Sequence, residues 1–284
     1  MLTSFAVILR IISNSTANLF QKKSAEVTSP LYTNLFSYLM MSLICIIPAM
    51  FVNWGHFSIE FWGYVIIAGT LCTIGTIALI EALNIGELSV LAPINSYKSI
   101  IGIISAFVLL GEIPTIKDFV CIIFIIIGSY FVLDTKTEPF SLKTFLRKDV
   151  LLRIFALICS GTEASFLKKI ILISSYKISL ILWCFSGFLC SLILYIFMNE
   201  HSQKLNTGKN YVNCFVIAIT LIIMQLTTNY IFTKMDVGSA LALFQLSSLV
   251  SLYFGYKIFH EQNMRRKILG TVIMITSAGM ILLG

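Results

Sequence analysis

Apolar residues dominate the chain in ten long runs, which charged residues and turn signals separate. Each run has about 20 residues, the length that an α-helix needs to cross the hydrocarbon core of a bilayer. The runs lack the strict alternation that is typical of a membrane β-barrel. The pattern therefore predicts an all-α membrane protein with ten transmembrane helices, over residues 2–20, 30–52, 61–83, 88–110, 116–133, 150–173, 178–198, 211–233, 237–259 and 268–284.

A polar segment divides the ten predicted spans into two groups of five. Residues 134–149 contain Pro139 and several charged side chains, whereas the other connections are short. A polar stretch of this kind between periodic segments is typical of a linker. We therefore expect residues 1–133 to form a first five-helix repeat, 134–149 a polar linker, and 150–284 a second five-helix repeat.

The two halves resemble one another in sequence. Residues 12–23 align with 158–169 at a shift of 146, and 89–92 align with 239–242 at a shift of 150. Glu112 after the fourth run has a counterpart in Glu261 after the ninth. An odd number of spans in each half forces the second half into the membrane upside down. Inverted-topology repeats are typical of secondary transporters, which bind substrate near the bilayer midplane.

The composition excludes several other classes of protein. Of the 284 residues 58% are hydrophobic and 12% are charged, and the mean hydropathy is +0.93, whereas a soluble domain carries about 25% charge. The seven cysteines form no Cys-x-x-Cys pair and the three histidines lie between the runs. We therefore expect no metal, no cofactor and no catalytic residues. The net charge of +7 suits anionic lipid headgroups rather than nucleic acid.

Charged side chains inside the predicted spans are candidates for a functional site, because each costs about 2.5–3.5 kcal/mol on insertion scales. Lys98 lies near the centre of the fourth span, Glu163 near the centre of the sixth, and Arg10 within the first. A hydrated cavity around these groups has one net positive charge and favours a carboxylate or a zwitterion such as an amino acid. Polar residues complete the predicted substrate site: Asn14, Asn18, Asn95, Tyr97, Gln225, Asn229, Gln245 and Ser248.

Structural interpretations compete with this substrate site. Lys98 and Glu163 could form an ion pair that only joins the halves, although buried pairs are poor stabilisers. Arg10 could extend to the N-terminal membrane face. If the site is functional, Glu163 also suggests proton coupling, because a substrate that displaces Lys98 from Glu163 would link binding to protonation.

Three further expectations concern helix geometry and packing. Pro93 predicts a kink in the fourth span beside Lys98, because proline removes a backbone donor and clashes with the preceding turn. Trp183 could line the cavity, although packing against lipid or the core is the favoured interpretation. Glu112 and Glu261 are expected to fasten helix ends rather than to bind a ligand.

Several short motifs are shared with one membrane-protein family. They are residues 20–23 at the end of the first span, 82–89 before the fourth, and Gly111-Glu112 after it. In these motifs the chain resembles the ten-helix EamA-like branch of the drug/metabolite transporter superfamily. The resemblance implies alternating-access transport of a small polar metabolite across a bacterial inner membrane, by a monomer or a homodimer. A binding or sensor protein, or a transporter of organic cations, remains an alternative.

The orientation in the membrane is open at this point. Thirteen basic residues, Arg153 among them, fall on the face opposite the termini, and five fall on the terminal face. The positive-inside rule then places both termini outside. The family resemblance implies that they lie inside.

Overall fold

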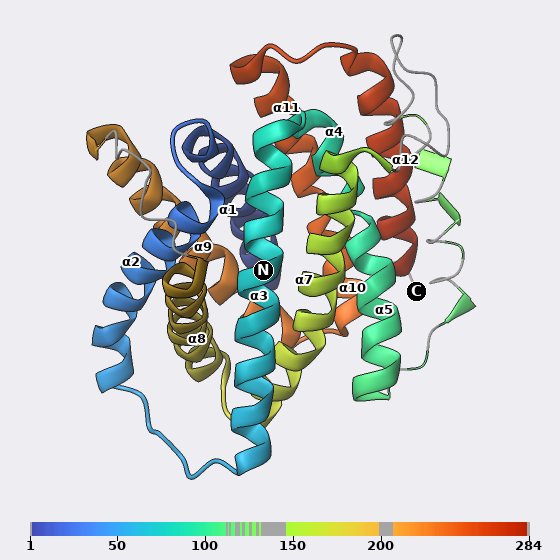
Figure 1. Ribbon diagram of the computed structural model, residues 1–284. Helices are drawn as coiled ribbons and strands as arrows, with labels where there is room; N and C mark the ends of the chain where they lie inside the picture. Colours follow the sequence, from blue (N-terminus) through green and yellow to red (C-terminus); the bar gives the residue numbers. More distant parts are fainter. Residues whose placement is uncertain are drawn as a thin grey trace.

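The computed structural model describes residues 2–111, 146–198 and 207–282, together with isolated positions between 113 and 131. The described part is almost entirely helical and contains no strand (Figure 1). Most of the predicted fifth span, residues 134–145 of the predicted linker, and Glu112 lie outside the described residues. The helices are α1 (Leu2–Ala25), α2 (Pro30–Met50), α3 (Ile59–Ile85), α4 (Leu88–Ile94), α5 (Tyr97–Leu110), α7 (Lys148–Ile173), α8 (Tyr176–Met198), α9 (Thr207–Phe232), α10 (Val237–Phe244), α11 (Ser247–Phe259) and α12 (Met264–Leu282).

Seven segments of the described chain are long and apolar enough to cross a membrane. They are α2, α3, α4 with α5, α7, α8, most of α9, and α10 with α11. Large apolar side chains such as Ile47, Phe51 and Val108 are exposed, as expected where lipid replaces water as the solvent. The prediction of an all-helical membrane protein is therefore confirmed, while ten spans are more than the described residues show.

Helices of the first half pack mainly against helices of the second half. The most extensive contacts join α3 to α7, α1 to α9 and α2 to α8 (Figure 1). Small residues permit this close approach. A Cβ added at Gly187 of α8 would lie 2.3 Å from the ring of Tyr38 in α2. In the sequence alignment of the two halves, α1, α2 and α3 correspond to α7, α8 and α9. If each helix is replaced by its counterpart, the pair α3–α7 becomes α9–α1 and the pair α2–α8 is unchanged, so the packing has the same pattern seen from either half.

The predicted fourth and ninth spans are each broken, at positions 150 residues apart. The first break separates α4 from α5 at Asn95 and Ser96, two residues after Pro93, as that proline predicts. The second separates α10 from α11 at Gln245 and Leu246, and it has no proline. At both breaks backbone N–H groups bond to the carbonyl three residues earlier, in 3₁₀ fashion.

Candidate functional site

A cavity of about 110 Å³ lies among helices of both halves and includes the first helix break in its wall. One water molecule needs roughly 10–15 Å³ on the same measure, so the cavity has room for several. Its polar lining consists of Arg10, Asn14, Asn18, Gln21, Tyr38, Cys72, Thr76, Asn95, Lys98, Arg153, Ser160, Glu163, Trp183, Gln225 and Thr228. Its apolar lining consists of Leu79, Ala164, Leu167, Leu221, Met224, Phe232 and Leu241.

Lys98 and Glu163 both line this cavity. Glu163 accepts a hydrogen bond of 2.6 Å from Trp183 Nε1. Lys98 is partly buried, and its ammonium group makes no hydrogen bond or ion pair with any described residue. The two side chains therefore do not form the close ion pair that was the structural alternative to a substrate site. The Lys98 ammonium group is instead without a partner among the described residues, in the wall of a cavity with room for several water molecules.

Arg10 points into the protein rather than to a membrane face. Its side chain is 4% exposed, and its guanidinium carbon lies 3.9 Å from the centre of the Phe244 ring. Nη1 donates to the carbonyl of Phe244 at 3.4 Å, and Nε donates to Thr228 Oγ1 at 3.5 Å. The interpretation that Arg10 extends to the N-terminal face is therefore wrong, because these partners hold it against the second broken helix.

Arg153 is the functional candidate that the sequence analysis missed. The sequence groups Arg153 with the basic residues on the membrane face opposite the termini, but Arg153 lies inside α7 and is 5% exposed. Nε donates to the carbonyl of Leu91 at 3.2 Å, and Nη2 donates to Asn95 Oδ1 at 2.7 Å. The lining of the cavity therefore includes three basic side chains and one acidic side chain, one basic side chain more than the sequence predicts.

Trp183 packs in a core cluster and also lines the cavity, the alternative that the sequence left open. Although buried, it reaches the cavity and bonds to Glu163 instead of serving only as packing. Its ring lies 5.2 Å from that of Tyr38, another lining residue. A buried indole N–H usually has a hydrogen-bond partner. The presence of Glu163 in the middle of the preceding span is therefore the sequence feature that could have indicated this contact.

The other predicted site residues fall into two groups. Asn14, Asn18, Asn95 and Gln225 line the cavity. Four others are not among the lining residues, because their polar groups bond to protein or their side chains pack in a core: Tyr97, Asn229, Gln245 and Ser248.

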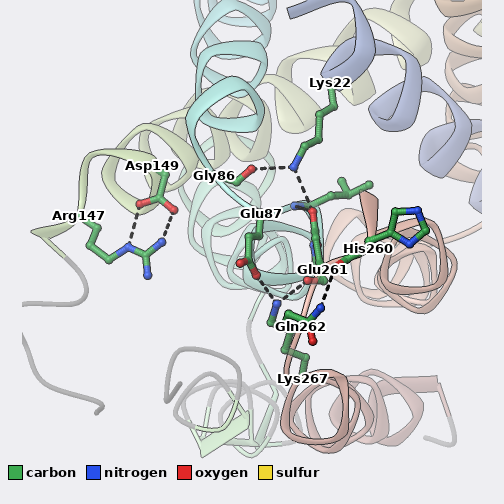
Figure 2. Close-up of polar contacts among 11 residues, drawn as sticks. Lys22, Gly86, Glu87, Arg147, Asp149, His260, Glu261, Gln262 and Lys267 are labelled. Atoms are coloured by element: carbon green, nitrogen blue, oxygen red, sulfur yellow. Dashed lines mark hydrogen bonds and ion pairs between the residues drawn. The ribbon is translucent and has the colours of Figure 1, made fainter. Parts of the chain in front are cut away.

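A network of charged residues surrounds the junction between α3 and α4 (Figure 2). Glu261 accepts hydrogen bonds from the backbone N–H groups of Leu88 and Ser89 at 2.8 and 2.7 Å and pairs with Lys22 at 3.0 Å. Burial alone would raise the pKa of Glu261, but hydrogen bonds from Ser89 and the charge of Lys22 outweigh it and hold that pKa below its ordinary value. Glu261 therefore fastens the start of α4, as the sequence predicts.

The same network extends to α12. Lys267 is 2% exposed, donates to Ser89 Oγ at 2.6 Å and pairs with Glu87. Lys22 also donates to the carbonyl of Gly86 at 2.8 Å. The junction between α3 and α4 is thus held by two lysines and one glutamate that come from three other parts of the chain.

Comparison with known proteins identifies the family. The model of the EamA-like transporter family matches residues 1–134 and 147–283, nearly the whole chain. The chain belongs to the EamA-like transporter family. A solved structure titled "Crystal structure of protein" aligns with this EamA-like protein at a TM-score of 0.74 and 11% identity, covering 99% of this chain and 96% of that chain. At this identity the likeness establishes the fold alone. No curated protein matches the chain.

Membership of the EamA-like family makes this chain an integral, multi-pass membrane protein of a transporter class. A transporter family is consistent with the expectation that the chain is not an enzyme. Within the described residues, no three His, Cys, Asp or Glu side chains are grouped as a metal site.

Proposed function

We propose that this EamA-like protein is a secondary active transporter of a small carboxylate or zwitterion, with amino acids favoured. Lys98 carries the proposal, because its ammonium group lines the cavity without a partner among the described residues. The excess of basic over acidic side chains in the cavity favours an anionic group there.

The chemistry of the cavity suggests how such a solute binds. Its carboxylate would take the position beside Lys98, and Arg10 and Arg153 would add positive potential. An amino group would be attracted to Glu163, and the amide side chains would supply further hydrogen bonds. The apolar lining offers a surface for an aliphatic or aromatic side chain. The amides concerned are Asn14, Asn18, Asn95 and Gln225.

Alternating access between two inverted five-helix repeats is the mechanism that we propose. The family model matches two segments of nearly equal length, and the helix breaks lie 150 residues apart. Discontinuous helices at the interface of inverted repeats are a feature of secondary transporters. Proton coupling through Glu163, placement in a bacterial inner membrane, and a monomeric or homodimeric state complete the proposal.

Uptake into proteoliposomes tests the proposal. The parent protein should show saturable uptake of one or more radiolabelled amino acids, and Lys98→Ala should reduce it by about tenfold or more. Lys177→Ala is the matched control, because Lys177 is an exposed lysine that does not line the cavity, and its uptake should equal that of the parent.

Other outcomes would overturn particular parts of this proposal. Binding of amino acids without flux would indicate a sensor protein. Thermal stabilisation by organic cations, with none by amino acids or carboxylates, would indicate a cation carrier. Equal loss of uptake in Lys98→Ala and Lys177→Ala would remove the special role of Lys98.

A further inference from the structure

Each helix break leaves backbone carbonyls outside the α-helical hydrogen-bond ladder. Asn95 N bonds to Ala92 O at 3.1 Å, so the carbonyl of Leu91 loses the partner that an unbroken helix would give it. Ser248 N bonds to Gln245 O at 2.8 Å, which removes the same kind of partner from Phe244. A buried carbonyl without a hydrogen bond is costly, so both groups need donors.

Arginines supply donors to both of these carbonyls. Arg153 donates to Leu91 O at 3.2 Å, and Arg10 donates to Phe244 O at 3.4 Å. Phe244 O also accepts a hydrogen bond of 2.7 Å from Ser247 Oγ. The arrangement is reciprocal between the halves. Arg153, on α7 of the second half, holds the break of the first half, and Arg10, on α1 of the first half, holds the break of the second half.

The two breaks also contact each other directly. Asn95 Nδ2 donates to Gln245 Oε1 at 3.1 Å, and these residues are 150 positions apart in the chain. Ser248 Oγ, just after the second break, donates to Ala92 O just before the first at 2.9 Å. The two breaks therefore lie next to each other, although each arginine donates to the carbonyl of one break only.

We propose that Arg10 and Arg153 are positioning residues that link occupancy of the cavity to the geometry of the broken helices. The link rests on the proposed function, because it assigns the substrate an anionic group. Both guanidinium groups line the cavity that contains Lys98. A carboxylate is a stronger acceptor than a neutral carbonyl, so a carboxylate held at Lys98 competes with the break carbonyls for the arginines. The substrate thereby favours a state in which the breaks are held less tightly.

Hydrogen–deuterium exchange of the full chain in lipid nanodiscs tests the two arginine–carbonyl contacts, here called the two clamps, separately. Arg153→Met should accelerate exchange of backbone amides in peptides covering residues 88–99 by about tenfold, and leave residues 237–249 close to parental rates. Arg10→Met should produce the opposite pattern with a smaller acceleration, because Ser247 Oγ still donates to Phe244 O. Lys98→Met is the matched control, because the Lys98 side chain lines the same cavity but donates to neither break. Both regions should retain parental exchange rates in this variant.

The crossed pattern distinguishes positioning from general stabilisation. Equal acceleration of both breaks in each variant, or a similar effect of Lys98→Met, would overturn the assignment. If Arg153→Met does not fold, Arg10→Met tests the clamp independently, and Arg153→Lys, which keeps the charge and one donor group, should give an intermediate acceleration.

The link to substrate is tested by adding a mixture of the common amino acids to the same samples. Exchange at both breaks should rise in the parent, and Lys98→Met should abolish the response. Uptake without this exchange response would overturn the link and leave the proposed function intact. The crossed pattern without any uptake would overturn the proposed function and leave the two clamps in place.

Discussion

Lys22 Nζ lies 3.0 Å from Glu261 Oε1, and this ion pair joins the end of α1 to the segment between α11 and α12. Glu261 uses the same carboxylate to accept two backbone N–H groups at the start of α4. One side chain of the second half therefore holds two helices of the first half. An alternating-access cycle that separates the halves at this end has to break these contacts.

Replacing Glu261 by glutamine should destabilise the protein by about 1–3 kcal/mol, because the amide cannot satisfy Lys22 and two backbone donors as a carboxylate does. The apparent melting temperature in detergent measures the effect. Glu26→Gln is the matched control, since Glu26 is exposed and lies one residue beyond the end of α1. A similar loss in both variants would show that net charge, not the Glu261 contacts, is responsible.

The stabilisation by Glu261 should depend on pH in one direction. Folding lowers the pKa of Glu261 below its ordinary value, so the folded protein favours the ionised form relative to the unfolded chain. The contribution is complete above the unfolded pKa of about 4.3 and is lost as the pH falls through the lower folded value. The difference in melting temperature between the parent and Glu261→Gln should therefore narrow as the pH falls below about 4. A difference that widens on acidification would contradict this assignment.

Gly255→Ala, in α11, should disturb the contacts between Glu261 and Ser89. A Cβ at residue 255 would lie 2.6 Å from Glu261 Oε2 and 3.1 Å from Ser89 Cβ, and crowding of a packed site typically costs about 1–3 kcal/mol. Gly63→Ala is the control, because nothing lies within 4 Å of its added Cβ in α3. There the higher helix propensity of alanine should leave stability unchanged or slightly raised. Equal melting temperatures for the two variants would rule out the close contact at Gly255.

Sequence patterns predict the positions of most helices, but they predict only one of the two helix breaks. Pro93 identifies the break between α4 and α5, because proline has a direct effect on the backbone hydrogen-bond ladder. The break between α10 and α11 contains no such residue. Its contacts with Arg10 and Asn95 come from residues more than 140 positions away, so no local pattern in the ninth span predicts it.

The candidate site was only partly predictable for a related reason. Lys98 and Glu163 stand out because they are charged residues near the centres of apolar runs. Arg153 lies in the first two turns of α7, where a basic residue can either reach the membrane face or turn inward. The carbonyl of Leu91 and the amide of Asn95 settle that choice, and both belong to the first half of the chain.

Trp183 should report the protonation of Glu163 through its fluorescence. Its Nε1 donates to Glu163 Oε1 at 2.6 Å, and a neutral carboxyl group next to an indole differs from a carboxylate in charge and in hydrogen bonding. Trp54→Phe combined with Trp62→Phe leaves Trp183 as the only tryptophan, since the chain has three. Its emission should then change with pH in one step, and adding Glu163→Gln should abolish that step. Tyr38, Cys72 and Lys98 line the same cavity and also titrate, so the attribution depends on this second variant. An emission step that survives Glu163→Gln would assign the proton to one of those neighbours and remove the basis for proton coupling through Glu163.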